Sequence, residues 1–215
     1  MDASILQKIT VYAIPLIFAI TLHEAAHAYA ARYFGDSTAY MLGRMTLNPI
    51  KHIDPVWTIL VPIVTLLVSP FVFGAAKPVP VNFGALRNPK RDMIWVAAAG
   101  PLANLAMMVA WAVIAKIAIV LGGTGPMYFL ALVGEAGIFV NALLMVFNLF
   151  PLLPLDGGRI LMGLLPNKLA YTFSRTEPYG MLILVALLVT GIVRKFMGPL
   201  LEFSMNSIYA IIGLS

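Results

Sequence analysis

A five-residue pattern, His23-Glu24-Ala25-Ala26-His27, lies at the end of a long apolar run. Two histidines four residues apart lie on one face of a helix, about 6 Å from each other. That spacing can hold one metal ion with two imidazoles and leave a carboxylate beside a metal-bound water. The alternative is an ordinary amphipathic helix. However, residues 9–22 are almost wholly apolar, and ionisable groups within a lipid-spanning helix usually mark function.

The composition indicates an integral membrane protein. Of 215 residues, 61% are hydrophobic and 11% are charged, whereas a soluble domain carries about 25% charged residues. The net charge of +5 comes from bases in short loops, so we interpret it as a topology signal and expect no nucleic-acid binding. Cysteine is absent, so any metal must bind to nitrogen or oxygen. The first apolar run continues into the histidine pattern, which argues against a cleaved signal peptide.

Hydropathy predicts an all-α polytopic membrane protein that forms a single domain over residues 1–215. We expect its core at about 4–165 and C-terminal helices at about 179–214. The apolar runs predict about five to six membrane segments. These runs are residues 4–34, 56–75, 93–121, 127–149, 179–195 and 200–214.

Prolines, glycines and polar residues interrupt these runs. The sequence Met197-Gly198-Pro199 predicts a break between the last two segments, and residues 159–178 are expected to form a polar loop. Pro78 and Pro80 favour an extended conformation. We therefore expect a short edge strand or a small sheet near residues 40–85.

Asp156 is the residue best suited to complete a metal site. An Asp-Gly pair such as Asp156-Gly157 is usually a turn, but two histidines need a third protein ligand, and a carboxylate is the usual choice. The surrounding prolines and glycines also indicate broken backbone lining a cavity in the membrane. His52, in a polar loop beside Asp54, is the rival third ligand. Asn148 could donate to a developing oxyanion or cap broken backbone.

Two separated motifs resemble the site-2 protease family of intramembrane zinc metalloproteases. They are His23-Glu24-Ala25-Ala26-His27 and Asn148-x-x-Pro151-x-x-x-Leu155-Asp156-Gly157. Ala99-Gly100-Pro101-Leu102-Ala103-Asn104, Ala76-Lys77-Pro78-Val79-Pro80-Val81 and His52-Ile53-Asp54-Pro55 fit the family too, so the resemblance covers most of residues 15–165. The soluble peptide-binding (PDZ) domain that many bacterial members carry is missing, so the chain resembles a compact member.

The resemblance implies a zinc endopeptidase that cuts transmembrane segments of other proteins, often in regulated signalling. One Zn²⁺ per chain would be held by His23, His27 and Asp156. Glu24 would take a proton from the activated water and deliver it to the leaving amine. The expected partners are a transmembrane protein or peptide substrate and the lipid bilayer.

A non-catalytic metal-binding membrane protein or a transporter is the competing interpretation. Glu135, Asn104, Asn141 and Lys116 are polar residues within apolar runs and could line a pathway, although such residues more often make helix contacts. Glu24 discriminates between these functions, because a metal carrier needs no base beside its two histidines.

A metal shared by His23 and Asp156 limits the topology. Both must lie at the same depth, which requires an even number of membrane crossings between them. Three apolar runs intervene, so we expect residues 56–75 to be a re-entrant hairpin. Ten of the 14 Lys and Arg residues then lie on the active-site side, which places that side in the cytoplasm of a multi-pass cell-membrane protein. The other four are Lys8, Lys116, Arg194 and Lys195.

Overall fold

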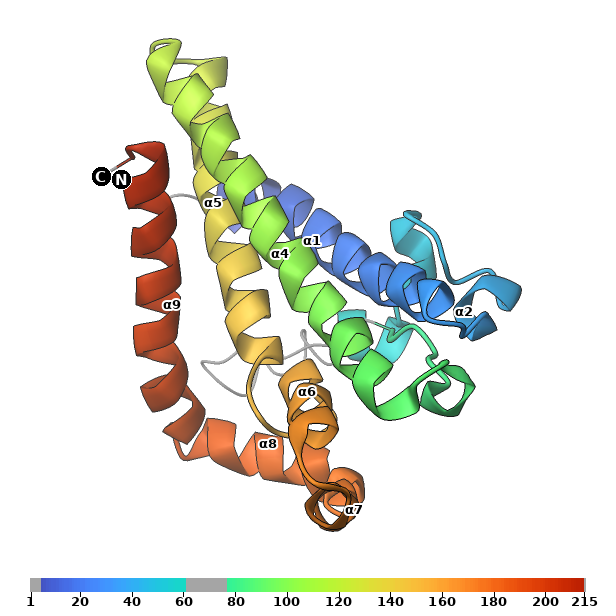
Figure 1. The fold of residues 1–215 in the computed structure, drawn as a ribbon. Coiled ribbons are helices and arrows are strands. Elements are labelled where there is room, and N and C mark those ends of the chain that lie inside the picture. Colours follow the sequence, from blue (N-terminus) through green and yellow to red (C-terminus); the bar gives the residue numbers. More distant parts are fainter. Residues whose placement is uncertain (1–4, 61–76, 215) are drawn as a thin grey trace.

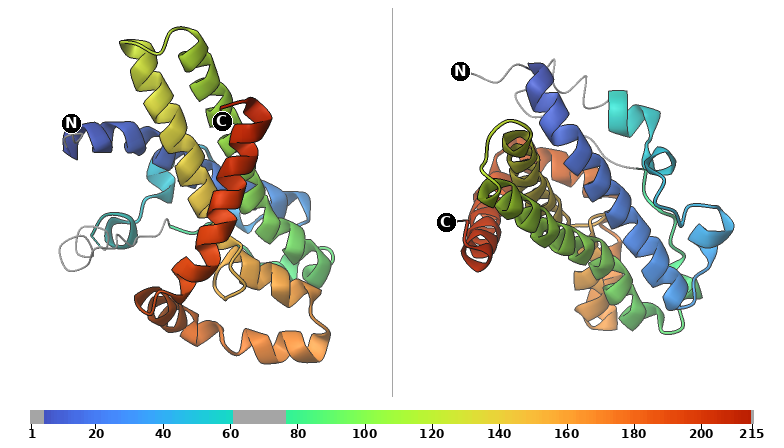
Figure 2. Two further views of the ribbon diagram at one scale, coloured as in Figure 1. Left: turned by 90° about the vertical axis from the view of Figure 1, so that its left-hand side faces the viewer. Right: turned by 90° about the horizontal axis from the view of Figure 1, so that it is seen from above.

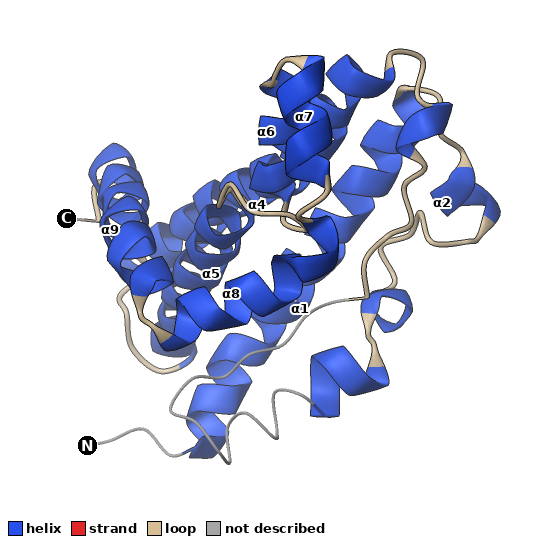
Figure 3. Cartoon of the chain, turned by 90° about the horizontal axis from the view of Figure 1, so that it is seen from below, coloured by secondary structure: helices blue, strands red, loops and turns tan. Residues whose placement is uncertain are grey.

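The structure is a computed structural model that describes residues 5–60 and 77–214. Within these ranges every regular element is a helix, as Figure 3 shows, so the all-α prediction is confirmed for the described residues. Elements labelled η are short 3₁₀ helices, except η2, which is π-helical. The elements are α1 (Ile5–Tyr33), α2 (Thr38–Met41), η1 (Pro49–His52), η2 (Pro55–Leu60), η3 (Phe83–Ala85), α4 (Pro89–Val120), α5 (Pro126–Asn148), α6 (Asp156–Leu164), α7 (Asn167–Ser174), η4 (Glu177–Tyr179), α8 (Gly180–Val189) and α9 (Ile192–Ile212).

The long helices α4 and α5 lie side by side, with α1 against them on one side and α9 on the other (Figures 1 and 2). Small residues allow the close approach of α4 and α5. A Cβ atom built on Gly137 would lie 2.2 Å from the ring of Trp111, and one on Gly134 would lie 2.8 Å from Ala115. Close contact through small residues is the usual way in which helices associate in lipid.

Three described helices are long and apolar enough to cross a membrane, and the protein is a membrane protein. They are Ile9–Tyr33, Pro89–Val120 and Pro126–Asn148, and a fourth span results if a bent helix pair near the C-terminus counts as one. The prediction of five to six membrane segments is therefore not confirmed.

The bent pair corrects the prediction for the C-terminal region. Helix α8 has only 10 residues, about 15 Å, and is too short for the crossing predicted at residues 179–195. The chain turns by 79° between α8 and α9. The turn lies at Gly191, whose φ of +73° suits glycine, and not at residues 197–199. Pro199 lies inside α9.

Residues 159–178 are also helical where a polar loop was expected. They form most of α6, all of α7 and most of η4, and these helices gather with α8 at one end of the long helices (Figures 1 and 3). Arg159 of α6 donates to Glu177 of η4, with Nη1 3.1 Å from Oε2. This ion pair holds the two short helices together, a contact that local hydropathy does not reveal.

The chain between α1 and α4 leaves and returns at the same end of the bundle. The Arg87 N–H donates to the Phe34 carbonyl at 2.9 Å, and the Lys77 N–H donates to the His52 carbonyl at 2.9 Å. The ends of this connection therefore lie on one side, as is required if His23 and Asp156 are to share one metal ion. The predicted re-entrant hairpin falls mainly on residues 61–76, which lie outside the described residues.

The predicted edge strand at residues 77–82 is not found in the described structure, where this segment is irregular. Pro78 and Pro80 have no N–H to donate. The N–H groups of Lys77, Val79 and Asn82 donate instead to His52, Glu24 and Asp36. With these donors already used, the segment has no strand partner among the described residues.

Candidate metal centre

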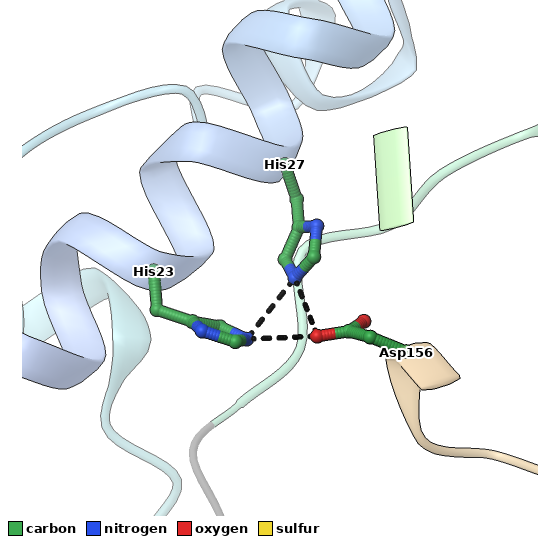
Figure 4. Close-up of side chains that lie close together, drawn as sticks. All are labelled: His23, His27 and Asp156. Carbon is green, nitrogen blue, oxygen red and sulfur yellow. Dashed lines mark hydrogen bonds and ion pairs between the residues drawn. The ribbon is translucent and has the colours of Figure 1, made fainter. Parts of the chain in front are cut away.

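Three side chains that could hold a metal ion converge from two helices (Figure 4). His23 and His27 lie on α1, and Asp156 is the first residue of α6. The two Nε2 atoms are 3.1 Å apart, and Asp156 Oδ2 lies 3.3 Å from His23 Nε2 and 3.4 Å from His27 Nε2. Both imidazoles are buried and Asp156 is half-buried. Among the described residues this is the group that could hold a metal ion.

These separations fit a zinc ion. Zinc bonds to imidazole nitrogen and carboxylate oxygen at about 2.0–2.1 Å, in tetrahedral geometry. Two ligand atoms at such distances lie about 3.3–3.4 Å apart. The three observed separations agree with this value to within about 0.3 Å. The arrangement leaves the fourth tetrahedral position to a non-protein ligand, as in catalytic zinc sites.

Hydrogen bonds on the far side of each ring turn the lone pairs toward this point. His23 Nδ1 donates to Asn104 Oδ1 at 2.6 Å, and His27 Nδ1 donates to the Val96 carbonyl at 2.8 Å. Asn104 Oδ1 is the acceptor because the Asn104 amide donates to Asn141 Oδ1 at 3.0 Å and to the Ala19 carbonyl at 3.3 Å. In the neutral ring, a proton on Nδ1 leaves Nε2 unprotonated, which is the form that binds metal.

A bound cation would relieve two unfavourable features of this arrangement. Two unprotonated nitrogens 3.1 Å apart repel each other. Asp156 Oδ2 is buried and has no hydrogen-bond partner among the described residues. A buried acceptor without a partner is costly. A bound zinc ion would satisfy all three atoms at once.

Gly100 forms the wall of the site on α4. A Cβ atom built there would lie 2.4 Å from His27 Nε2 and 2.7 Å from His23 Nε2. No side chain fits at this position without displacing the metal-binding nitrogens. Glycine thus lets α4 approach α1 where the two histidines point toward it.

Two glycines bring Asp156 to the histidines. A Cβ atom on Gly157 would lie 2.2 Å from the Leu149 carbonyl oxygen, and one on Gly158 would lie 2.5 Å from the Leu152 carbonyl carbon. The first turn of α6 therefore packs directly on the backbone that follows α5. The Asp-Gly-Gly sequence marks the start of a helix here, although such a pair usually marks a turn.

Glu24 lies on α1 between the two histidines and is half-buried. Its Oε2 accepts the backbone N–H of Val79 at 2.7 Å. Glu24 precedes His27 by three residues, a spacing that places two side chains on the same side of a helix, and in this histidine pattern the glutamate is the candidate base for a metal-bound water. The centre therefore combines a metal site with a candidate base.

The other two candidates make hydrogen bonds to backbone carbonyls outside the metal-binding group. His52 is fully buried, but its Nε2 lies 2.9 Å from the Thr46 carbonyl, and His52 is not among the described metal-binding group. The Asn148 amide donates to the Leu144 carbonyl of its own helix at 2.9 Å, as in the backbone-capping alternative. Its oxyanion role stays a prediction.

Sequence reasoning did not identify Gly100, Val79 or the ring-orienting role of Asn104. Asn104 was considered as part of a stretch that fits the family and, like Asn141, as a pathway or helix-contact residue. The available signal was the helical spacing of Gly100 and Asn104, which places both on one face of α4. Spacing alone does not show which neighbouring helix that face meets.

Comparison with known proteins gives several relatives. The chain is 39% identical over 202 residues to "Putative zinc metalloprotease YwhC" of Bacillus subtilis, covering 91% of this chain and 87% of the relative. It is 28% identical over 186 residues to "Putative zinc metalloprotease Rip2" of Mycolicibacterium smegmatis, covering 84% of this chain and 67% of the relative. Rip2 of Mycobacterium tuberculosis H37Rv is 27% identical over 172 residues, covering 80% of this chain and 63% of the relative. No family model and no solved structure matches the chain.

Proposed function

The chain belongs to the site-2 protease family, and we propose that it is an intramembrane zinc endopeptidase. Its substrates are peptide bonds within or near transmembrane segments of other membrane proteins, cut in regulated intramembrane proteolysis. The observation that carries this proposal is the convergence of His23, His27 and Asp156 beside Glu24. A metal carrier needs the first three residues but not the fourth.

Each residue at the site has a separate role in the proposed peptide hydrolysis. A zinc ion at this site supplies a water molecule whose pKa is lowered toward about 7. Glu24 accepts the proton of that water and later donates it to the leaving amine. Asn104 and the Val96 carbonyl hold the two imidazoles in the metal-binding tautomer. A single domain spanning residues 1–215 would contain all of these groups.

The depth of the centre supports cleavage within the membrane. Gly100, which faces both histidines, lies eight residues after Asp92, the last charged residue at the start of α4, about 12 Å along the helix. The hydrocarbon core of a bilayer is about 30 Å thick. A substrate that reaches this depth is a transmembrane segment, and its helix must unwind before a peptide bond is exposed.

The positions of the basic residues support an active site that opens toward the cytoplasm. Val193 and Met197 near the start of α9 pack against Val146 near the end of α5, so Arg194 and Lys195 lie at the metal-site end. Lys116 Nζ donates to the Gly213 carbonyl at the other end of α9. Twelve of the 14 Lys and Arg residues thus lie on the metal-site side, where ten were expected.

The transporter alternative has less support. Asn104 and Asn141 were candidates for lining a pathway, but both are fully buried in the hydrogen-bond chain behind His23. Lys116 is bound to the C-terminal end of α9. The two asparagines therefore have partners that fit a fixed metal site, and Lys116 has a helix-end partner away from it.

Replacement of Glu24 by Gln tests the proposal. The variant retains the three metal-binding side chains, so we expect one zinc per chain by elemental analysis and loss of cleavage by at least about 100-fold. Cleavage is followed with a panel of fluorescent transmembrane peptides in nanodiscs, with Glu202→Gln as the matched control. A Glu24→Gln protein that cleaves at the wild-type rate would show that Glu24 is not the base. A wild-type protein that binds zinc but cleaves no peptide would favour the non-catalytic alternative.

A further inference from the structure

Glu24 has a fixed backbone partner that the proposed chemistry does not explain. Its Oε2 accepts the Val79 N–H at 2.7 Å, from a segment 55 residues away in sequence. This is the one hydrogen bond of the Glu24 side chain given by the described residues. Hydrogen bonds from a backbone N–H to an ionised carboxylate are short and about twice as strong as neutral ones.

The sequence around Val79 leaves a single donor at this position. Pro78 and Pro80 have no N–H, so between residues 78 and 80 only Val79 can donate. A residue before proline is also restricted to extended conformations, which limits how the Val79 N–H can turn. The Val79 side chain is 7% exposed and packs against Ala28 and Ala39.

Contacts on both sides hold the segment independently of Glu24. Before Val79, Arg44 Nη2 donates to the Lys77 carbonyl at 3.0 Å. After Val79, the Asn82 N–H donates to Asp36 Oδ2 at 2.7 Å. Asp36 is 1% exposed, and its Oδ1 accepts the Thr38 N–H at 2.9 Å. The position of the Val79 N–H is thus fixed by contacts other than the one to Glu24.

We propose that the Val79 N–H is a positioning group for the catalytic base. It holds Glu24 Oε2 and so leaves Oε1 to exchange protons with the water. It also keeps the carboxylate from turning toward the metal and becoming a fourth protein ligand. The residue acts through Glu24 and touches no substrate. This inference rests on the proposed endopeptidase function, although the hydrogen bond itself can be tested without activity.

An NMR experiment tests the hydrogen bond. The chain has three Pro-Val pairs, at residues 55–56, 78–79 and 80–81, so labelling with ¹³C-proline and ¹⁵N-valine selects three backbone amides. In Glu24→Gln, we expect the Val79 amide proton to move upfield and to exchange faster with solvent. The Val56 and Val81 signals serve as internal controls. A Val79 signal that moves no more than these two would overturn the proposal.

An amide-to-ester replacement tests the positioning role. Incorporation of the 2-hydroxy acid analogue of valine at position 79 removes the N–H and keeps the side chain. We expect kcat to fall by about tenfold or more, a fraction of a general base's contribution, with KM within about twofold and zinc at one per chain. Such a split between kcat and KM would not follow from a general loss of structure.

The same ester at Val81 is the matched control, because no described residue accepts its N–H. We expect it to retain the wild-type kcat. Equal kcat values for the two esters would refute the positioning role. A Val79 shift in Glu24→Gln without any peptide cleavage by the wild type would instead refute the endopeptidase function and leave the hydrogen bond established.

Discussion

Gly100 is the residue at which the metal site is most sensitive to a small change. Its missing Cβ is what allows two imidazole nitrogens to face α4, since that atom would lie 2.4 Å from one and 2.7 Å from the other. We expect Gly100→Ala to weaken zinc binding by at least about 100-fold, beyond the usual effect of losing an outer hydrogen bond. Competition with a chromophoric chelator measures this change.

Gly198→Ala is the control for a glycine-to-alanine change inside a helix. Gly198 lies inside α9, and nothing lies within 4 Å of a Cβ atom built there. Pro199 disfavours helical backbone for a residue with a Cβ at position 198, which opposes the usual gain of about 0.5–1 kcal/mol for alanine over glycine in a helix. We therefore use this variant only for its zinc affinity, which we expect to be unchanged because the added Cβ meets no other atom. Wild-type zinc affinity in Gly100→Ala would show that the histidines can move aside.

Helix geometry and metal chemistry explain which site residues were predictable. The spacing of His23 and His27 is local to one helix, and Asp156 followed from the need for a third ligand. Gly100 and Val79 act across contacts between segments far apart in the chain. Their roles depend on how α1 meets α4 and the 77–82 segment, which no local pattern encodes.

Asn104 connects three helices at the metal centre. Its oxygen accepts from His23 on α1, and its amide donates to Asn141 on α5, while Asn104 itself lies on α4. In lipid such polar contacts between helices contribute about 0.6–2 kcal/mol each. The link therefore fixes the ring of His23 and the packing of the three helices together.

Asn104→Leu removes both contacts at similar volume. We expect zinc affinity to fall by about 10- to 100-fold, as for other outer partners of metal-binding histidines. Asn104→Asp keeps an acceptor for His23 and should recover part of the loss. Titration with a chelator gives the three affinities.

Asn148→Ala serves as the control, because the Asn148 amide contacts only its own helix among the described residues. We expect its zinc affinity to equal that of the wild type. If Asn148 donates to the oxyanion as predicted, its kcat falls by about 10²–10³. An Asn104→Leu protein with wild-type zinc affinity would show that the link does not orient His23.

At the level of elements, long apolar runs were predictable and short helices were not. Residues 4–34, 93–121 and 127–149 matched α1, α4 and α5 closely, because about 20 apolar residues have one stable form in lipid. The helices α6 to α8 depend on tertiary contacts instead. Gly180 illustrates this, since a Cβ atom there would overlap the Leu153 carbonyl.

The bend between α8 and α9 changes the topology of the whole molecule. Hydropathy placed Arg194 and Lys195 across the membrane from the metal centre. The packing of α9 places them on the same side, because α8 does not cross and α9 runs along α5 from the metal-site end (Figure 1). The charge asymmetry then agrees with the positive-inside rule more strongly than the sequence predicted.

The absence of cysteine makes this topology directly testable. Single cysteines can be introduced at three exposed positions: Thr124 between α4 and α5, Thr172 on α7 and Lys195 on α9. We expect a membrane-impermeant maleimide added to intact cells to label Thr124→Cys alone, since only that position lies opposite the metal centre.

Thr172→Cys and Lys195→Cys should react only after the membrane is permeabilised. Labelling of Lys195→Cys together with Thr124→Cys would restore a crossing at residues 179–195 and contradict the arrangement of α8 and α9. Labelling of Thr172→Cys and Lys195→Cys without Thr124→Cys would keep the fold but reverse its orientation. The metal centre would then open to the outside, and the substrates would have to be sought among segments that unwind at that face.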